Sequence, residues 1–346
     1  MSVSTLFILK NRTQTYDNYS CYSYSLNGYG LYNSASNMVR MLNDNNISSA
    51  LELVVDNNGI DAVVAEHRPS HVFIEAVWVV PSKFAELIPL HPNIQWVIRI
   101  HSETPFLANE GQAVGWLFEY LNYPNITLAF NSLNIYEEFS NLVDESVKDR
   151  VVYLPNHYDG AVATSISIAP EDGVINIGCF GAVRPLKNQL IQAIAAVDFA
   201  NRIGKRLKFH INATRVEQKG EPVLRNIRSL FDNFPNHQLV EHTWMEHQDF
   251  VNVIASMDIS MQVSLSETFN IVTADAVVNN VPVVVSKEVN WINWLFHADP
   301  NLSRSILNKL MVIHRTEVFN SHNLNKISLN RHNKNARKLW LKFVTQ

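Results

Sequence analysis

The segment from Leu51 to Ile100 constrains the fold more than any other part of the chain, because short apolar runs alternate in it with helix-like segments. The apolar runs are LELVV, HVFIEAVWV and IQWVIRI, and the segments between them are IDAVVAEH and PSKFAELIPLHP. Short apolar runs separated by helices are typical of a parallel sheet that is buried on both faces. We therefore predict an α/β fold in which several strand ends meet at one edge of a sheet.

The length of the chain predicts two domains, since 346 residues exceed what one ordinary core accommodates. A strand at Leu6 to Leu9 opens the first domain, and the strands in ITLAFNS and RVVYLPNHYD close it. A stretch of Ala, Thr, Ser and Pro indicates a linker, and the strand VINIG with its glycine turn starts the second domain. The predicted boundaries are 1–158 for the first domain, 159–172 for the linker, 173–320 for the second domain and 321–346 for a basic C-terminal helix.

Composition excludes several classes of protein. Hydrophobic residues make up 47% and charged residues 17%, which is ordinary for a globular protein. The sequence shows no apolar run of the roughly 20 residues that a bilayer span needs, and the apolar part of its first residues is too short for a signal peptide, so we expect a cytoplasmic protein. Cys21 and Cys179 are far apart and lack metal-ligand spacing. The net charge of -4 argues against tight nonspecific binding to nucleic acid, although the last residues are basic.

The stretch from Ser264 to Ser286, SLSETFNIVTADAVVNNVPVVVS, contains the most informative polar residues. It predicts a loop with Glu267, a helix from about Phe269 to Val278 that includes Asp275, and a strand from Val281 to Val285. The free amide groups at the start of such a helix suit a bound phosphate. A nucleoside diphosphate attached to a polyhydroxylated group could place its phosphate on the helix end and its hydroxyls on the two acids.

The same stretch resembles the signature SxxETFGxxxxEAxxxGxPVVxS of retaining GT-B glycosyltransferases of the sucrose-synthase and phosphatidylinositol-mannosyltransferase kind. Glu267 matches the first Glu, Asp275 replaces the second, and Asn270 replaces the Gly. The resemblance implies two Rossmann-like domains that face a central cleft, with a C-terminal helix packing back on the first domain. It also implies that Glu267 binds the donor sugar, that Asp275 binds the ribose, and that Thr268, Phe269 and Asn270 belong to the donor site.

Two cations after the first strand of the second domain complete the implied donor site. Arg184 and Lys187 follow Gly178 and Gly181 and flank Pro185, which favours a first helical turn. Positive charge is unfavourable at a helix start unless an anion binds there, and the GT-B family has an Arg and a Lys at matching positions. The alternative is a solvated pair of surface cations. Trp244 stands where related enzymes often bind the donor base, or else it is part of the core.

The acceptor side of the implied site is carried by scattered residues of the first domain. His101 follows a strand and resembles a histidine that related transferases place beside the transferred sugar; the alternative is a capped strand end. Gly28 and Gly30 resemble a glycine loop at which such enzymes bring acceptor and donor phosphate together, or they form a tight turn before a helix. The remaining candidates for acceptor contact are Glu75, Glu103, Asn109 and Glu110, the last two of which could instead cap a helix.

The resemblance implies a retaining glycosyltransferase, with His101, Arg184, Lys187 and Glu267 as its catalytic residues and a nucleoside-diphosphate sugar, UDP-linked for preference, as donor. No Asp-x-Asp pair occurs in the sequence, so we expect neither a metal nor another cofactor. The segment HSETPFLANEG, which starts at His101, and the richness in Asn resemble bacteriophage enzymes, some of which glycosylate hydroxymethylated pyrimidines in duplex DNA. A cell-surface glycan or a small molecule is the alternative acceptor. A nucleotide-sugar epimerase and a non-catalytic binding protein are alternatives from other classes.

Overall fold

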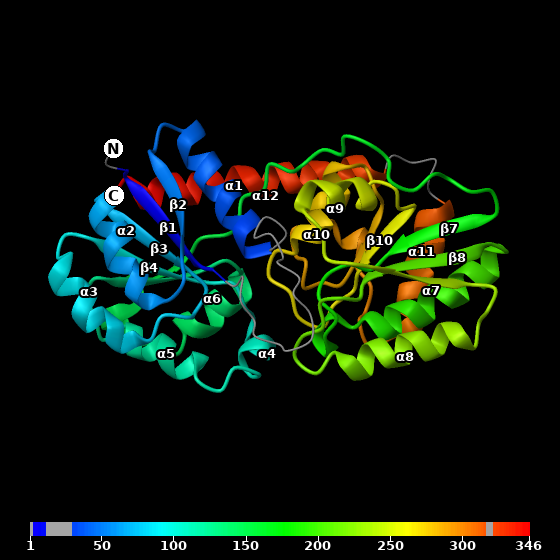
Figure 1. The fold of residues 1–346 in the computed structure, drawn as a ribbon, viewed down its shortest axis with the longest axis horizontal. Coiled ribbons are helices and arrows are strands. Elements are labelled where there is room, and N and C mark those ends of the chain that lie inside the picture. The colour runs from blue at the N-terminus through cyan, green and yellow to red at the C-terminus, as the bar shows by residue number, and fades with distance from the viewer. Residues whose placement is uncertain (1–2, 12–29, 316–320) are drawn as a thin grey trace. The chain divides into compact units, whose positions relative to one another are not determined.

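The computed structural model describes residues 3–11, 30–315 and 321–346. The chain divides into two compact units. Unit 1 contains Met1–Asp159 and Asn333–Gln346, and unit 2 contains Gly160–His332. Each unit is built on one parallel sheet with helices on its faces, as the alternation of apolar runs and helical segments predicts (Figure 1).

Unit 1 contains a six-stranded parallel sheet in the order β2-β1-β3-β4-β5-β6. Its strands are β1 (Thr5–Lys10), β2 (Ser49–Val54), β3 (His71–Glu75), β4 (Gln95–Ile100), β5 (Ile126–Phe130) and β6 (Val151–Tyr153). Its helices are α1 (Gly30–Asp44), α2 (Ile60–His67), α3 (Phe84–Leu90), α4 (Thr104–Leu107), α5 (Ala113–Tyr120) and α6 (Leu133–Ser140), with short 3-10 turns η2 (Asn57–Gly59), η3 (Pro81–Lys83) and η4 (Glu145–Arg150).

Successive side chains of a strand point to opposite faces, so the unit 1 sheet has a separate hydrophobic core on each face. Leu6 and Ile8 of β1 pack on one face with residues of α2, α3, α5 and α6, whereas Phe7 packs on the other face with α1 and with Trp340. Figure 1 shows α1 and the C-terminal helix on one face of this sheet, and α3 and α5 on the other. Both faces are therefore covered, which explains why apolar side chains are buried on both faces of β1, β3, β4 and β5.

Unit 2 contains a five-stranded parallel sheet in the order β11-β10-β7-β8-β9. Its strands are β7 (Val174–Gly178), β8 (Arg206–Asn212), β9 (Gln238–His242), β10 (Ile259–Gln262) and β11 (Val283–Val285). Its helices are α7 (Gln189–Ile203), α8 (Glu221–Asp232), α9 (His247–Ile254), α10 (Ile271–Val278) and α11 (Ser303–Arg315), with 3-10 turns η5 (Pro185–Lys187) and η6 (Trp294–Phe296). The strand order reverses between β7 and β10, and ligands of open α/β sheets bind at such a reversal.

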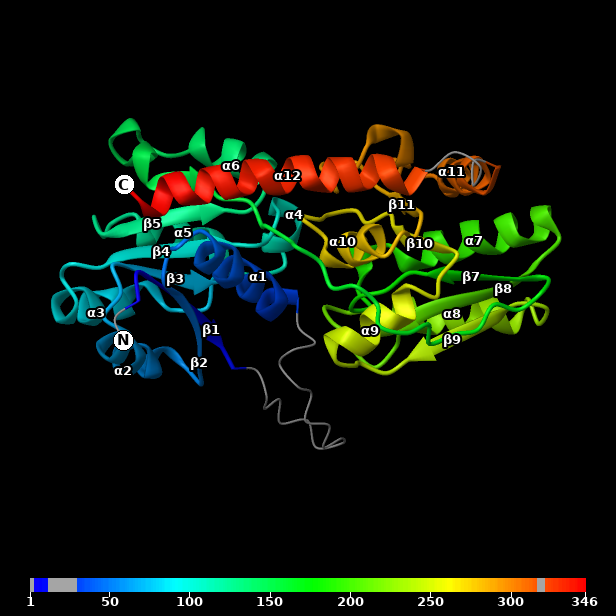
Figure 2. The ribbon, with the colours of Figure 1, turned by 90° about the horizontal axis from the view of Figure 1, so that it is seen from above.

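The C-terminal helix α12 (Ser321–Val344) is one unbroken helix (Figure 2). Its last part belongs to unit 1, where the indole nitrogen of Trp340 donates to the carbonyl oxygen of Pro155 at 2.8 Å. The predicted linker 159–172 contains neither helix nor strand, and it is fixed to unit 2: the Ala163 amide donates to Asn279 Oδ1 at 2.7 Å, and the Thr164 amide to Asn252 Oδ1 at 2.9 Å. None of the helices in the described ranges has the length and apolarity needed to cross a bilayer.

A buried histidine pair in unit 2 predicts how its stability depends on pH. His210 on β8 stacks on His242 of β9 with ring centroids 5.2 Å apart, and burial, followed by the neighbouring His242 and Lys208, lowers the pKa of His210 to about 3. In the unfolded chain His210 takes up a proton below its ordinary pKa of 6.5, whereas in the folded protein it stays neutral down to about pH 3. The stability that His210 contributes above pH 6.5 is therefore lost as the pH falls toward 3.

We expect the free energy of unfolding to fall by up to about 1.4 kcal/mol for each pH unit in this range because of His210. Urea denaturation between pH 7 and pH 4 measures this slope. His210→Gln should flatten it, and an unchanged slope in that variant would show that other groups cause the acid sensitivity.

Candidate functional site

The loop after β7 brings two cations to the carboxyl edge of the unit 2 sheet. Gly181 has φ +111°, a left-handed backbone that favours glycine, and its amide donates to Asn212 Oδ1 at 2.9 Å. Arg184 then precedes the 3-10 turn η5, which ends at Lys187. Asn188 has φ +59° and donates from its side chain to the carbonyl oxygens of Val263 and Pro300. The helical turn that Pro185 favours is therefore the short 3-10 turn η5, and Asn188 separates it from α7.

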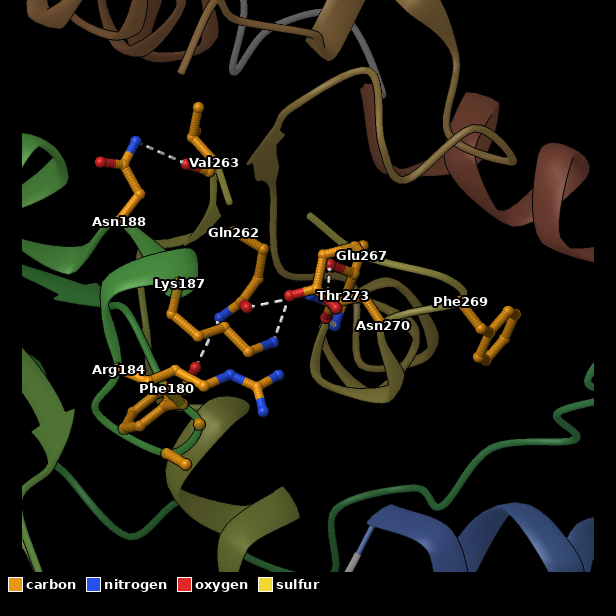
Figure 3. Close-up of polar contacts among 12 residues, drawn as sticks. Phe180, Arg184, Lys187, Asn188, Gln262, Val263, Glu267, Phe269, Asn270 and Thr273 are labelled. Carbon is orange, nitrogen blue, oxygen red and sulfur yellow. Dashed lines mark hydrogen bonds and ion pairs between the residues drawn. The ribbon is translucent and has the colours of Figure 1, made fainter. Parts of the chain in front are cut away.

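The ammonium group of Lys187 forms an ion pair with Glu267 Oε1, and both side chains are nearly buried, at 12% and 8% exposure. Burial lowers the pKa of Lys187, Glu267 partly offsets that effect, and Arg184 adds to it. Figure 3 shows Arg184 and Lys187 extending toward Glu267 from the same loop. The Arg184 guanidinium also lies 3.6 Å from a carboxylate oxygen of Glu217. The predicted convergence of Arg184, Lys187 and Glu267 within unit 2 is thus present in the structure.

Helix α10 starts at Ile271, two residues later than the predicted Phe269, because Asn270 has a left-handed backbone with φ +61°. The Asn270 side-chain oxygen accepts from the Thr273 amide at 2.9 Å, and its nitrogen donates to Gln262 Oε1 at 3.0 Å. Asn tolerates this conformation better than other residues with a Cβ atom, which explains how it can replace a glycine. The side chain also satisfies one of the amides that we expected to bind phosphate, so the binding capacity of this helix end is smaller than predicted.

Asp275 lies in the second turn of α10 with its side chain fully buried. Its Oδ1 accepts from His247 Nε2 at 3.0 Å, and His247 is the first residue of α9. Burial lowers the pKa of His247, but the hydrogen bond and the charge of Asp275 outweigh burial and raise it. Asp275 is thus a buried acid that orients His247. The imidazole of His247, with 20% exposure, is the more accessible side chain of the pair.

The other predicted donor residues have different surroundings. Trp244 is half-buried, and the Arg215 guanidinium lies 4.5 Å from its ring centroid, so it is not an ordinary core residue. Phe269 is buried against Trp291 and His332, and Figure 3 shows it directed away from Lys187. Thr268 is half-buried. Gly30 is an exposed residue at the start of α1 in unit 1, and Gly28 lies outside the described residues.

A second cluster of polar residues is buried in unit 1 at the ends of β3 and β4. Glu75 and Arg99 are partners in the register of the two strands, and both are fully buried. Glu75 Oε1 accepts from Arg99 Nη1 at 2.8 Å, and Glu75 Oε2 accepts from His101 Nε2 at 2.6 Å. Glu75 and His101 are thus brought together, but the carboxylate of Glu75 lies inside the protein, away from solvent.

The remaining acceptor candidates do not form one group with this cluster. Glu103 is buried and accepts a hydrogen bond from the Ser132 hydroxyl. Asn109 is exposed and donates to the carbonyl oxygen of Pro105 at 3.0 Å, so it stabilises the end of the short helix α4 and does not cap a helix start. Glu110 is exposed in the following turn.

Several residues near the predicted site were missed at the level of sequence. Gln262 ends β10 and bridges two loops, since it accepts from Asn270 and donates to the carbonyl oxygen of Phe180 at 2.9 Å. Arg99 lies inside the otherwise apolar strand β4, and that signal could have identified it. His247 carries no comparable signal. In the described part of the chain, no three His, Cys, Asp or Glu side chains are grouped so that they could hold a metal ion.

A scan against protein-family models gives no match, and neither does a search of curated proteins. Solved structures do match over the whole chain. An apo structure of OtsA shares 14% identity at a TM-score of 0.69, with 99% of each chain covered. A structure described as trehalose-6-phosphate from E. coli bound with UDP-2-fluoro glucose shares 13% identity at 0.67, again with 99% of each chain covered.

A UDP-forming trehalose-phosphate synthase from Burkholderia xenovorans shares 11% identity at a TM-score of 0.64, with 100% of this chain and 99% of that chain covered. At such low identity the likeness bears on the fold. Two parallel-sheet α/β units and neighbours that cover the full length establish the GT-B architecture for this chain.

Proposed function

We propose that the protein is a retaining glycosyltransferase that takes a sugar from a nucleoside-diphosphate sugar and transfers it to a hydroxyl group. The observation that carries this proposal is the buried Lys187–Glu267 pair beside Arg184, at the carboxyl edge of the unit 2 sheet. Burying an ion pair costs free energy that apolar residues would avoid, so its presence at a ligand-binding edge favours a functional role. The GT-B fold adds support, because one structure with this fold is described as bound with UDP-2-fluoro glucose.

The donor diphosphate would bind to Arg184 and Lys187. Arg184 offers a planar set of donors that suits phosphate oxygens, and Lys187 offers a compact charge. As the bond between the anomeric carbon and the phosphate oxygen breaks, negative charge grows on the leaving diphosphate, and these two cations stabilise it. Glu267 holds Lys187 in place and, through its second oxygen, would bind a hydroxyl of the donor sugar.

The acceptor oxygen then bonds to the anomeric carbon on the face from which the diphosphate leaves, and its proton passes to a phosphate oxygen of that leaving group. This route conserves configuration without a covalent enzyme intermediate. It needs no metal ion, since the cations of the protein supply the charge. A glycosyl adduct trapped on Glu267 would contradict it.

We assign the two buried acids to supporting roles. Glu75 and Asp275 are fully buried, so neither can contact a ligand in solution directly in this conformation. We propose that Glu75 orients His101, which would contact the reacting sugars, and that Asp275 holds His247 near the ribose. From the sequence we expected Glu75 to contact the acceptor and Asp275 to contact the ribose directly. The supporting roles proposed here replace those expectations.

For the acceptor we favour a sugar or a sugar phosphate, since several solved structures of this fold are trehalose-phosphate synthases. Hydroxymethylated pyrimidines in phage DNA are the second candidate, and the exposed cations Arg331, Lys334, Arg337, Lys338 and Lys342 of α12 favour it. Acceptor binding that weakens steeply with salt would support DNA, since phosphate contacts release counterions. Turnover on a free sugar or sugar phosphate that is insensitive to salt would exclude it.

A mass-spectrometric screen tests the proposal. Nucleotide sugars with UDP, GDP and ADP would be incubated with sugars, sugar phosphates, glycans and modified duplex DNA, and the products identified. The proposal predicts one glycosylated acceptor with retained configuration, and its loss in Arg184→Ala. A changed donor sugar without any acceptor would instead indicate an epimerase, and donor binding without product a binding protein.

A further inference from the structure

The carboxylate of Glu75 is the centre of a fully buried network in unit 1. Arg99 donates from Nη1 to Glu75 Oε1 at 2.8 Å and from Nη2 to Asn156 Oδ1 at 2.8 Å. The guanidinium also lies 4.8 Å from the ring centroid of Trp340 in α12. Glu75, Arg99 and Trp340 are each 0% exposed. The network therefore shields Glu75 from water on the Arg99 side and provides it with a permanent positive partner.

The charge state of Glu75 follows from these contacts. Burial alone would raise its pKa, but Arg99 and His101 outweigh burial and lower it. Glu75 is therefore an ionised carboxylate, which can accept hydrogen bonds but cannot donate them. Its second oxygen, Oε2, lies 2.6 Å from Nε2 of His101. Nε2 must then carry a proton, because two acceptors cannot form this hydrogen bond.

The other ring nitrogen of His101 has the opposite requirement. Asn131 Nδ2 lies 3.2 Å from His101 Nδ1, and an amide NH2 group can only donate. With the Asn131 amide in this orientation, Nδ1 carries a lone pair and no proton. Burial lowers the pKa of His101; Glu75 opposes this and Arg99 adds to it, so the net direction is downward. All three observations agree on one neutral tautomer.

We infer that Glu75, held ionised by Arg99, is a positioning residue that fixes His101 as the neutral imidazole protonated on Nε2, so that Nδ1 accepts a hydrogen bond from a sugar hydroxyl. The tautomer rests only on the contacts within unit 1, whereas the sugar ligand rests on the proposed function. The hydroxyl would take the place of the Asn131 amide at Nδ1. His101 thus acts as an acceptor toward its ligand and cannot donate to it from this nitrogen.

A conservative variant tests the role of Glu75. In Glu75→Gln the new amide has one acceptor oxygen and one donor nitrogen, and Arg99 requires the oxygen. The amide nitrogen would then face His101 Nε2, which favours loss of the Nε2 proton and the appearance of the Nδ1–H tautomer. A carboxylate-to-amide change beside a catalytic histidine acts in this way in the Ser-His-Asp triad.

The measurement is ¹⁵N–¹H correlation NMR on the full chain labelled in histidine, with the His101 signals assigned from their loss in His101→Asn. The wild-type protein at pH 7 should show the neutral Nε2–H pattern. Glu75→Gln should shift the population toward Nδ1–H and lower kcat/KM about 10- to 100-fold, the range expected for one hydrogen bond to a reacting group. Glu52→Gln is the matched control, because Glu52 pairs with His67 at 2.9 Å near the surface of the same unit.

A second variant keeps the inference testable if Glu75→Gln does not fold. Asn131→Asp places an acceptor at Nδ1, so His101 should become doubly protonated at pH 7, with an imidazolium NMR signature. A wild-type His101 that is an imidazolium or the Nδ1–H tautomer would overturn the inference, and so would an unchanged tautomer in Glu75→Gln. If His101 is the neutral Nε2–H tautomer but the protein transfers no sugar, the proposed function is rejected. The role of Glu75 in fixing the tautomer would still hold.

Discussion

The Lys187→Met variant is expected to lower kcat/KM for the nucleotide-sugar donor about 10³-fold, the effect of removing a preorganised charge that stabilises a leaving group. Lys187 is nearly buried and paired with Glu267, so no solvent ion can easily replace it. Its loss also leaves the Glu267 carboxylate buried without its cation. Steady-state release of nucleoside diphosphate, measured with the best donor and acceptor pair, gives the effect.

A surface lysine provides the control for this variant. Lys208 pairs with Glu171 at 2.7 Å, and the pair is more exposed than that of Lys187. Surface ion pairs contribute about 0–1 kcal/mol, so Lys208→Met should leave kcat/KM nearly unchanged. If Lys187→Met keeps kcat/KM within about threefold of the Lys208→Met value, the pair with Glu267 has no part in the chemistry.

The Asn270→Ala variant is expected to destabilise unit 2 by about 2–4 kcal/mol. A left-handed backbone costs an Ala residue about 1–2 kcal/mol, and loss of the hydrogen bond to the Thr273 amide costs about 1 kcal/mol more. The variant also leaves Gln262 Oε1 buried without the 3.0 Å contact from Asn270. Urea denaturation followed by tryptophan fluorescence measures the change.

Two further variants separate the causes of this loss. Asn270→Gly removes the backbone cost, so it should be about 1–2 kcal/mol more stable than Asn270→Ala. Asn280 has a similar backbone, with φ +62°, but lies exposed in a turn, so Asn280→Ala should show the backbone cost with little else. Equal stabilities of the Ala and Gly variants at position 270 would refute the role of the left-handed conformation.

The fold was predictable because its determinants are local. The apolar runs that became β3 and β4 bury side chains on both faces, as strands of a covered parallel sheet do, and the segments between the strands have helical spacing. The start of the second unit was predictable from the strand VINIG and the glycine turn after it, in which Gly181 adopts a positive φ. The break between η5 and α7 was not predictable, because Asn188 is held by carbonyl groups of Val263 and Pro300, far away in the sequence.

The proposed donor site was predictable to the extent that its residues belong to sequence motifs. Arg184, Lys187 and Glu267 converge because parallel strands place their carboxyl ends at one edge of the sheet. The buried pairs were not predictable in the same way. Glu75 meets Arg99 because β3 and β4 pair in one particular register, and Asp275 meets His247 because α9 packs on α10. Register and helix packing depend on the whole tertiary structure, so no single stretch of sequence encodes them.

Calorimetric titration of nucleoside diphosphates tests the central claim most directly, because it requires neither the acceptor nor the sugar to be known. UDP, GDP and ADP would each be titrated into the full chain and into Lys187→Met, Arg184→Ala and Lys208→Met. We predict that one diphosphate, UDP for preference, binds the wild-type protein and Lys208→Met equally. It should bind Lys187→Met and Arg184→Ala at least about tenfold more weakly, the loss expected for one charge-assisted hydrogen bond. Binding of none of the three, or equal binding to all four proteins, would contradict a nucleotide-sugar site in unit 2.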